Sequence, residues 1–157
     1  MPEAPVGLRS RIRGALLVPL LALALALVEP PAAAQDDPDS DAKFNAKAAL
    51  ISARVVYLTS QSYAGVTPKL LQEKNPELRF VDNAPSTGPA VLSVQVQSRA
   101  QLRIAVYGSK TCWGIREQGR RTGVATLYAR RPGPNNDCTA GSFRDSDFVE
   151  HERVWKH

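Results

Sequence analysis

Few side chains of this chain could do acid–base, nucleophilic or metal chemistry. The 157 residues include two histidines, His151 and His157, and two cysteines, Cys112 and Cys138. A nucleophile needs a base within hydrogen-bond reach, and two zinc-binding histidines on one helix are typically four positions apart, whereas these are six apart. No G-x-S-x-G motif, phosphate-binding loop or dinucleotide fingerprint occurs. We predict no catalytic site, no metal and no cofactor.

The composition is that of one small globular domain. The chain is 43% hydrophobic and 22% charged, with a formal net charge of +5. Such values argue against wholesale disorder, a collagen-like repeat and a protein with several membrane spans. They do not identify a small-molecule substrate.

The N-terminus predicts export. Three arginines between positions 9 and 13 precede an unbroken apolar run, 14–28, and the small residues Ala32 and Ala34 follow. This is the layout of a secretory signal peptide, 1–34, with cleavage before Gln35. The alternative is a retained anchor that would keep the protein in contact with the membrane. A 15-residue run is about 22 Å long as a helix, short of the roughly 30 Å hydrocarbon core. The predicted location is secreted or cell-surface.

Export changes the interpretation of the two cysteines. Outside the cytoplasm thiols are oxidised, so Cys112 and Cys138 are expected to form an intramolecular disulfide. A loop of about 27 residues would be worth roughly 3.5 kcal/mol by the chain-entropy estimate. A zinc site is the less favoured alternative because it needs further ligands.

Positive charge is concentrated between residues 99 and 131. Eight cations and the single anion Glu117 give this segment a charge of +7. On contiguous hairpins these side chains could gather into a surface for an anionic polymer such as DNA, or form an ordinary solvated basic face. The possible polyanion-binding residues are Arg99, Arg103, Lys110, Arg116, Arg120, Arg121, Arg130 and Arg131.

Two helices are predicted ahead of the sheet. After a short acidic tether, 35–40, apolar residues recur at helical spacing and predict a long helix over 41–61. The apolar stripe is expected to be the buried face of this helix; it comprises Phe44, Ala48, Ile51, Val55 and Leu58. Thr67 and Pro68 predict the start of a short helix over 68–74.

Strict alternation then predicts strands. Apolar and polar residues alternate over 92–97 and over 102–107, and further strands are expected around 112–115 and 124–129. The prediction is an α+β fold in which one long N-terminal helix packs on an antiparallel sheet of about four strands. The other sheet face is expected to be exposed; it would display Ser93, Gln95, Gln97, Arg103 and Tyr107.

Several runs of residues resemble the globular domains of type IV pilins and pseudopilins. They are VVYLTSQSYAGVTPKLL, NPELRFVD, STGPAVLSV and, above all, SKTCWGIRE. The resemblance implies a pilin-like α+β domain over 41–157 in which Cys112 and Cys138 staple the C-terminal loop to the sheet. It also places Tyr63 and Gly65 in the turn after the helix, and Trp113 and Ile115 in the sheet beside the disulfide.

The prepilin N-terminal motif is missing. That motif is cut after a glycine, and the new N-terminus carries glutamate at its fifth position. Counting from Ala15, which follows Gly14, the fifth residue is Pro19. The resemblance therefore implies a pilin-like head without the sequence that makes a filament subunit.

Together these features predict a non-catalytic extracytoplasmic protein that acts through surface contacts. Its partners would be proteins at the cell envelope, and it would act in envelope assembly, secretion or adhesion. The alternative is a secreted binding module for an anionic polymer such as DNA, and a secreted enzyme with a concealed site is a third hypothesis.

Overall fold

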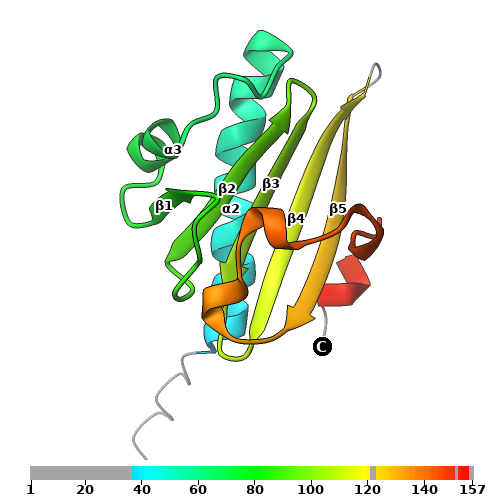
Figure 1. Cartoon of the computed structure of the whole chain (residues 1–157). Coiled ribbons are helices and arrows are strands. Elements are labelled where there is room, and N and C mark those ends of the chain that lie inside the picture. The colour runs from blue at the N-terminus through cyan, green and yellow to red at the C-terminus, as the bar shows by residue number, and fades with distance from the viewer. Residues whose placement is uncertain (1–36, 121–122, 151, 156–157) are drawn as a thin grey trace, which may run out of the picture. The chain divides into compact units, whose positions relative to one another are not determined.

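The computed structural model describes residues 37–120, 123–150 and 152–155. In this part of the chain α2 (Pro38–Ser60) and α3 (Pro68–Lys74) precede five strands, and four short 3-10 helices follow. Figure 1 shows α2 behind the sheet and the C-terminal segment in front of it. None of the helices in the described ranges is both long enough and apolar enough to cross a membrane. The predicted signal peptide, 1–34, lies outside these ranges.

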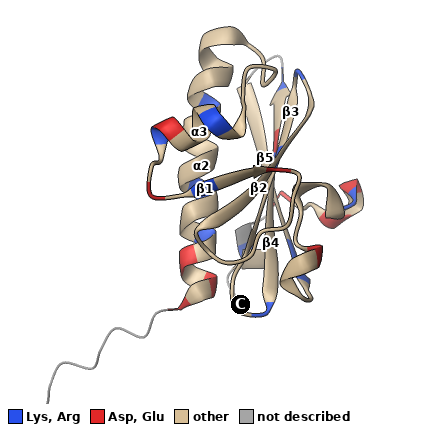
Figure 2. Ribbon diagram, turned by 60° about the vertical axis from the view of Figure 1, so that its left-hand side comes forward, with Lys and Arg blue, Asp and Glu red and all other residues tan. Residues whose placement is uncertain are grey.

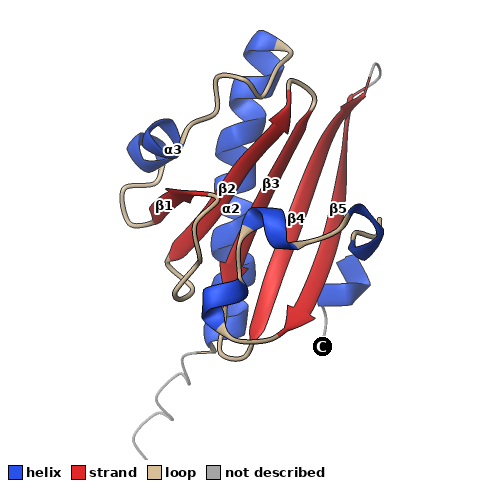
Figure 3. Ribbon diagram, in the orientation of Figure 1, coloured by secondary structure: helices blue, strands red, loops and turns tan. Residues whose placement is uncertain are grey.

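The sheet is mixed and has five strands. They are β1 (Arg79–Asp82), β2 (Val91–Ser98), β3 (Gln101–Tyr107), β4 (Thr111–Arg120) and β5 (Gly123–Pro132). They lie side by side in chain order, as Figure 3 shows. β1 runs parallel to β2, with Arg79 opposite Val91, and the other neighbours are antiparallel.

The predicted architecture of one long N-terminal helix on an antiparallel sheet of about four strands is therefore wrong. Within the described residues there are two α-helices, of 23 and 7 residues, and a five-stranded mixed sheet. The missed strand, β1, has only four residues. Four residues are too few for alternation to stand out, and parallel pairing depends on a neighbour that lies further along the chain.

Capping residues define both helices. Asp37 caps α2 by accepting a hydrogen bond from the Asp39 N–H at 3.1 Å, and Pro38 follows as the first helical residue. The helix thus begins three residues before the predicted start at 41 and ends where Gln61 adopts a left-handed conformation. The predicted short helix is confirmed as α3, whose Thr67 hydroxyl accepts from the Leu70 N–H.

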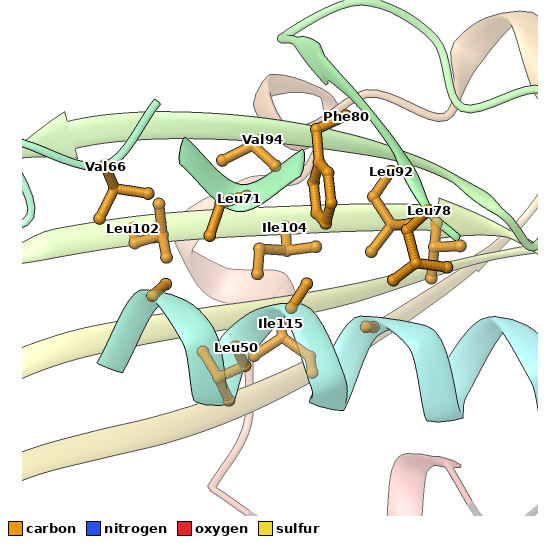
Figure 4. Packing of buried hydrophobic residues seen from close by; sticks show 14 of the residues in the cluster. Leu50, Val66, Leu71, Leu78, Phe80, Leu92, Val94, Leu102, Ile104 and Ile115 are labelled. Carbon is orange, nitrogen blue, oxygen red and sulfur yellow. The ribbon is translucent and has the colours of Figure 1, made fainter. Parts of the chain in front are cut away.

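The predicted buried stripe of α2 faces solvent instead. The face that packs on the sheet is made mainly of alanines, with two larger residues; it comprises Ala42, Ala46, Ala49, Leu50, Ala53 and Tyr57. In Figure 4, Leu50 points towards the sheet near Ile115. Small side chains let the helix lie close to strands that carry large ones, such as Leu92, Ile104 and Trp113. The larger exposed residues gave a stronger periodic signal than the alanines that pack.

The second face of the sheet is also covered. Residues 135–148 cross it and, with Ala105, Leu127 and other sheet residues, form a second apolar cluster that contains both cysteines and two phenylalanines. Ser93 and Arg103, which were expected to be exposed, are 0% and 6% exposed. Alternation showed that these residues share a face, but not that a segment about 40 residues downstream returns to cover it.

The chain then passes around the β5 edge. Tyr128 of β5 and Val149 exchange two backbone hydrogen bonds of 2.8 and 3.0 Å. Beyond this bridge Trp155 is buried on the α2 side, where its Nε1 donates to the Ala129 carbonyl and its ring meets Trp113 edge-on. The C-terminal segment therefore contributes to both cores.

Candidate functional site

Three of the predicted polyanion-binding arginines hold the C-terminal segment on the sheet. Arg103 of β3 donates to the Phe143 carbonyl at 2.9 Å and forms an ion pair with Asp145. Arg116, its partner across to β4, donates to the same Asp145 oxygen at 2.7 Å. Both guanidiniums also lie over the Phe148 ring. These two cations therefore serve as contacts within the protein.

Arg131 of β5 completes this set. Its guanidinium donates to the carbonyls of Ser142, at 3.1 Å, and Asp137, at 2.6 Å, and it lies over the Phe143 ring. We call Arg103, Arg116 and Arg131 the arginine clamp. Loss of solvent at the contact acts to raise the pKa of the Asp145 carboxyl, but the charges of Arg103 and Arg116 lower it below its usual value.

The other predicted polyanion residues are not gathered with the clamp. Arg99 and Lys110 are exposed in the turns at opposite ends of β3. Arg120, near the β4–β5 turn, lies 3.4 Å from Glu150, and Arg130 is an exposed β5 residue with an interaction of its own. Arg121 lies outside the described residues. Figure 2 shows the basic segments scattered over several elements of the domain.

The predicted disulfide between Cys112 and Cys138 is confirmed. Their Cα atoms are 5.4 Å apart and both residues are buried. Cys112 is the second residue of β4, while Cys138 follows the loop after β5. The bridge therefore ties residues 135–148 to the sheet near the start of this segment. The arginine clamp holds the same segment further along the chain.

A buried polar cluster lies between α2 and the sheet. Arg54 Nε and Nη2 donate to Glu117 Oε1 at 3.0 and 2.6 Å, and Nη2 also donates to Thr126. Glu117 is fully buried, and its second oxygen and the Tyr63 hydroxyl have no hydrogen-bond partner in the structure. Burial raises the pKa of Glu117, and Arg54 offsets part of this rise. Burial also raises the pKa of Tyr63, and the charge of Glu117 raises it further.

A second polar contact fixes the start of α2. Asp39 accepts hydrogen bonds of 3.0 Å from Trp113 Nε1, from the Ser109 backbone N–H and from the Ser109 hydroxyl. Burial acts to raise the pKa of Asp39, but these hydrogen bonds and Lys43 lower it below its usual value. A Cβ at Gly108 would lie 1.8 Å from Asp39 Oδ1, so the β3–β4 turn needs glycine there.

A pocket of about 490 Å³ lies where β2 meets the start of α3 and the end of β1. Its lining mixes Val66, Val94 and Val96 with the polar residues Thr67 and Gln95, and Asp82 is its only ionisable lining residue. The described residues include no group of three or more His, Cys, Asp and Glu side chains placed to hold a metal ion. His151 and His157 lie outside the described residues.

The feature that sequence reasoning misplaced is the outer face of α2. Phe44, Ile51, Val55 and Leu58 are 72%, 62%, 51% and 61% exposed. We call these four residues, with the half-buried Ala48 between them, the α2 stripe. The periodic pattern had located the stripe, but only the alanine face beside it could have indicated which side meets the sheet.

Comparisons with protein families, curated proteins and solved structures found no match to this chain.

Proposed function

We propose that this protein is a non-catalytic extracytoplasmic protein that acts through surface contacts with protein partners at the cell envelope, in assembly, secretion or adhesion. The observation that carries the proposal is the exposed α2 stripe. Soluble domains seldom leave a row of large apolar side chains in water on one element, and such rows mark interaction surfaces.

The stripe has no part in the folded core of the described residues. The sheet is covered by the opposite face of α2, which Leu50 and the alanines form. Side contacts already hold the helix, because Asn45 donates to the Pro89 carbonyl and Asn75 donates to Ser52. Since α2 is held without it, the stripe is available to a partner.

The disulfide supports an extracytoplasmic location. Structural disulfides persist in oxidising compartments and are rare where glutathione and thioredoxin keep thiols reduced. Cys112 and Cys138 pair in this fold, and the N-terminus has the layout of a secretory signal. Both features agree with export.

The shifted carboxylates support a non-catalytic function. Glu117 is bound to Arg54, Asp39 to Trp113 and Ser109, and Asp145 to Arg103 and Arg116. Each of these contacts joins two elements of the domain. Their perturbed pKa values thus have a structural cause, as ion pairs within folds commonly do.

The polyanion hypothesis remains a prediction. Three of its eight residues form the arginine clamp, and Arg99 and Lys110 lie at opposite ends of β3. The resemblance to type IV pilins also remains a prediction, without the helix-on-four-strands architecture that it implied.

The proposal is tested in producing cells by fractionation and site-specific photocross-linking. A photoreactive residue replaces Ile51 in the stripe or, as the matched control, Ser60, which is exposed at the end of the same helix. We expect the chain outside the cytoplasm and adducts with envelope-resident chains from position 51 but not 60. A cytoplasmic chain, or no difference between the two positions, contradicts the proposal.

A further inference from the structure

The α2 stripe has the spacing of a coiled-coil seam. Its five residues, Phe44, Ala48, Ile51, Val55 and Leu58, follow one another at intervals of four, three, four and three. This is the d–a–d–a–d pattern of a heptad repeat, in which knobs from one helix fill holes on another. The buried alanine face occupies the b, c and f positions on the opposite side.

The geometry points to a second copy of this chain as the occupant of the stripe, with the two α2 helices packed in parallel. This inference rests on the proposed function and names the partner of the same surface. Parallel packing sets each stripe residue beside its own copy, and the resulting interface is two-fold symmetric. Val55 at an a position and Leu58 at the following d position are the pairing that favours two strands.

The charges beside the seam favour a partner without acidic flanks. The cations at the g positions are Lys47 and Arg54, and both are turned towards their own domain. Lys47 Nζ lies over the Trp155 ring, 5.9 Å from its centroid, and Arg54 is bound to Glu117. The seam therefore offers no unmet positive charge to an acidic helix.

The same flanks select the parallel orientation. In a parallel pair, g positions face e positions of the partner, which here are Ser52 and Thr59. Lys47 would lie near Ser52 of the second copy, and Arg54 near its Thr59. An antiparallel pair would instead set the long g-position side chains of the two copies against each other, without these hydroxyls between them.

A short seam suffices because α2 is already ordered. From Phe44 to Leu58 the stripe is about 21 Å long, and isolated helices of that size are marginal in water. Packing on the sheet and the Asp37 cap hold α2 before any partner arrives. Association therefore costs little further ordering of the backbone. Such a small interface predicts a reversible dimer with a Kd of about 10–100 µM.

Sedimentation of the full chain, in the form its host exports, tests the dimer. We expect the mean mass to rise from monomer towards dimer between about 1 and 200 µM. The double variant Ile51→Asn, Val55→Asn should remain monomeric, with its far-ultraviolet spectrum and melting temperature retained. Val149→Asn is the matched control, since Val149 is an exposed apolar residue outside the stripe. A wild-type monomer at 200 µM overturns the inference, as does dimerisation that the double variant preserves.

Single cysteines test the orientation, because the native cysteines form a disulfide and the described residues hold no free thiol. Leu58→Cys should cross-link efficiently on oxidation in a parallel pair, where the two Cα atoms come within about 7 Å. Ser60→Cys, at an f position, should not. In an antiparallel pair Leu58 would lie opposite Phe44 of the second copy and about 21 Å from its own copy, so a dimer without this cross-link overturns the parallel arrangement. If sedimentation shows a monomer but photocross-linking at position 51 still gives envelope adducts, only the self-association is overturned. If sedimentation shows a monomer and photocross-linking gives no adducts, the proposed function is contradicted as well.

Discussion

Arg54 on α2 and Glu117 on β4 form an ion pair of 2.6 Å in which the carboxylate is fully buried and the guanidinium side chain is 35% exposed. The pair fixes α2 against the sheet at a residue that lies beside the exposed stripe on the helix surface. A buried charge that loses its oppositely charged partner is costly, because solvent cannot reach it to replace that charge.

Arg54→Leu should therefore destabilise the protein by about 3 kcal/mol at pH 8, the lower end of the range for broken buried pairs because Arg54 is partly exposed. Burial raises the pKa of Glu117, and Arg54 offsets part of that rise. Arg54→Leu should therefore raise the pKa of Glu117 further. Stability linked to a raised carboxyl pKa is present below the unfolded pKa and is lost as pH rises through the folded one. Urea unfolding should thus show a larger loss at pH 8 than at pH 5, and equal losses would contradict this. The double variant Arg54→Leu, Glu117→Gln should lack the difference.

Removal of the disulfide should weaken the whole domain. Cys138→Ser should lower the free energy of unfolding by about 2–5 kcal/mol, because the unfolded chain regains the freedom of the closed loop. The measurement is urea unfolding under non-reducing conditions. The double variant Cys112→Ser, Cys138→Ser is the control without a lone thiol and should lose a similar amount. A loss below about 1 kcal/mol would show that the bridge adds little to the packing of the second core.

The two faces of α2 should respond differently to truncation. Leu50 is 6% exposed and Ile51 is 62% exposed, although they are adjacent in sequence. Leu50→Ala should cost about 2–5 kcal/mol through the cavity it leaves, whereas Ile51→Ala should stay within about 0.5 kcal/mol. Unfolding is measured at about 1 µM, below the predicted dimer Kd. Similar losses at both positions would mean that the stripe is part of the monomer's core.

Asp145→Asn should loosen the segment that covers the second sheet face. Loss of the charge weakens contacts to Arg103 and Arg116, so amides of residues 140–148 should exchange faster with deuterated water at pH 7. The pKa of Asp145 is lowered, so its contribution is present above the unfolded pKa and is lost as pH falls through the folded one. The stability difference from wild type should then shrink towards pH 3. Asp137→Asn, in the same segment, is the matched control, and equal exchange in both variants would contradict a role for the ion pair.

Polyanion binding should be weak if the arginine clamp is structural. Arg99 and Arg120 lie near the same end of the sheet, where they could reach two phosphates of duplex DNA, while Lys110 lies at the other end. Two contacts predict a slope of log affinity against log salt near −1.8, at about 0.9 per phosphate. Arg99→Ala with Arg120→Ala should abolish most of that slope, and Lys110→Ala should not. A slope of −3.6 or steeper would instead require four cations and would support the polyanion hypothesis.

Local rules were enough to predict part of this structure. Alternation identified the cores of β2 and β3, Thr67 and Pro68 marked α3, and two cysteines in a chain with a predicted export signal implied their disulfide. Each of these features depends on residues close in sequence or on a chemistry with one available partner.

Tertiary structure decided the rest. Periodicity places residues on a common face but does not say what that face meets, so the stripe was assigned to the core and Arg103 to the surface. The fold reverses both assignments: alanines let α2 lie close to the sheet, and Phe143 and Asp145 return from about 40 residues downstream to bind the terminal nitrogens of Arg103. Such contacts between distant segments leave no periodic signal. The sequence by itself therefore determined which residues share a face of a helix or strand, and only the packing of distant segments decided which of those faces are buried and which remain available to a partner.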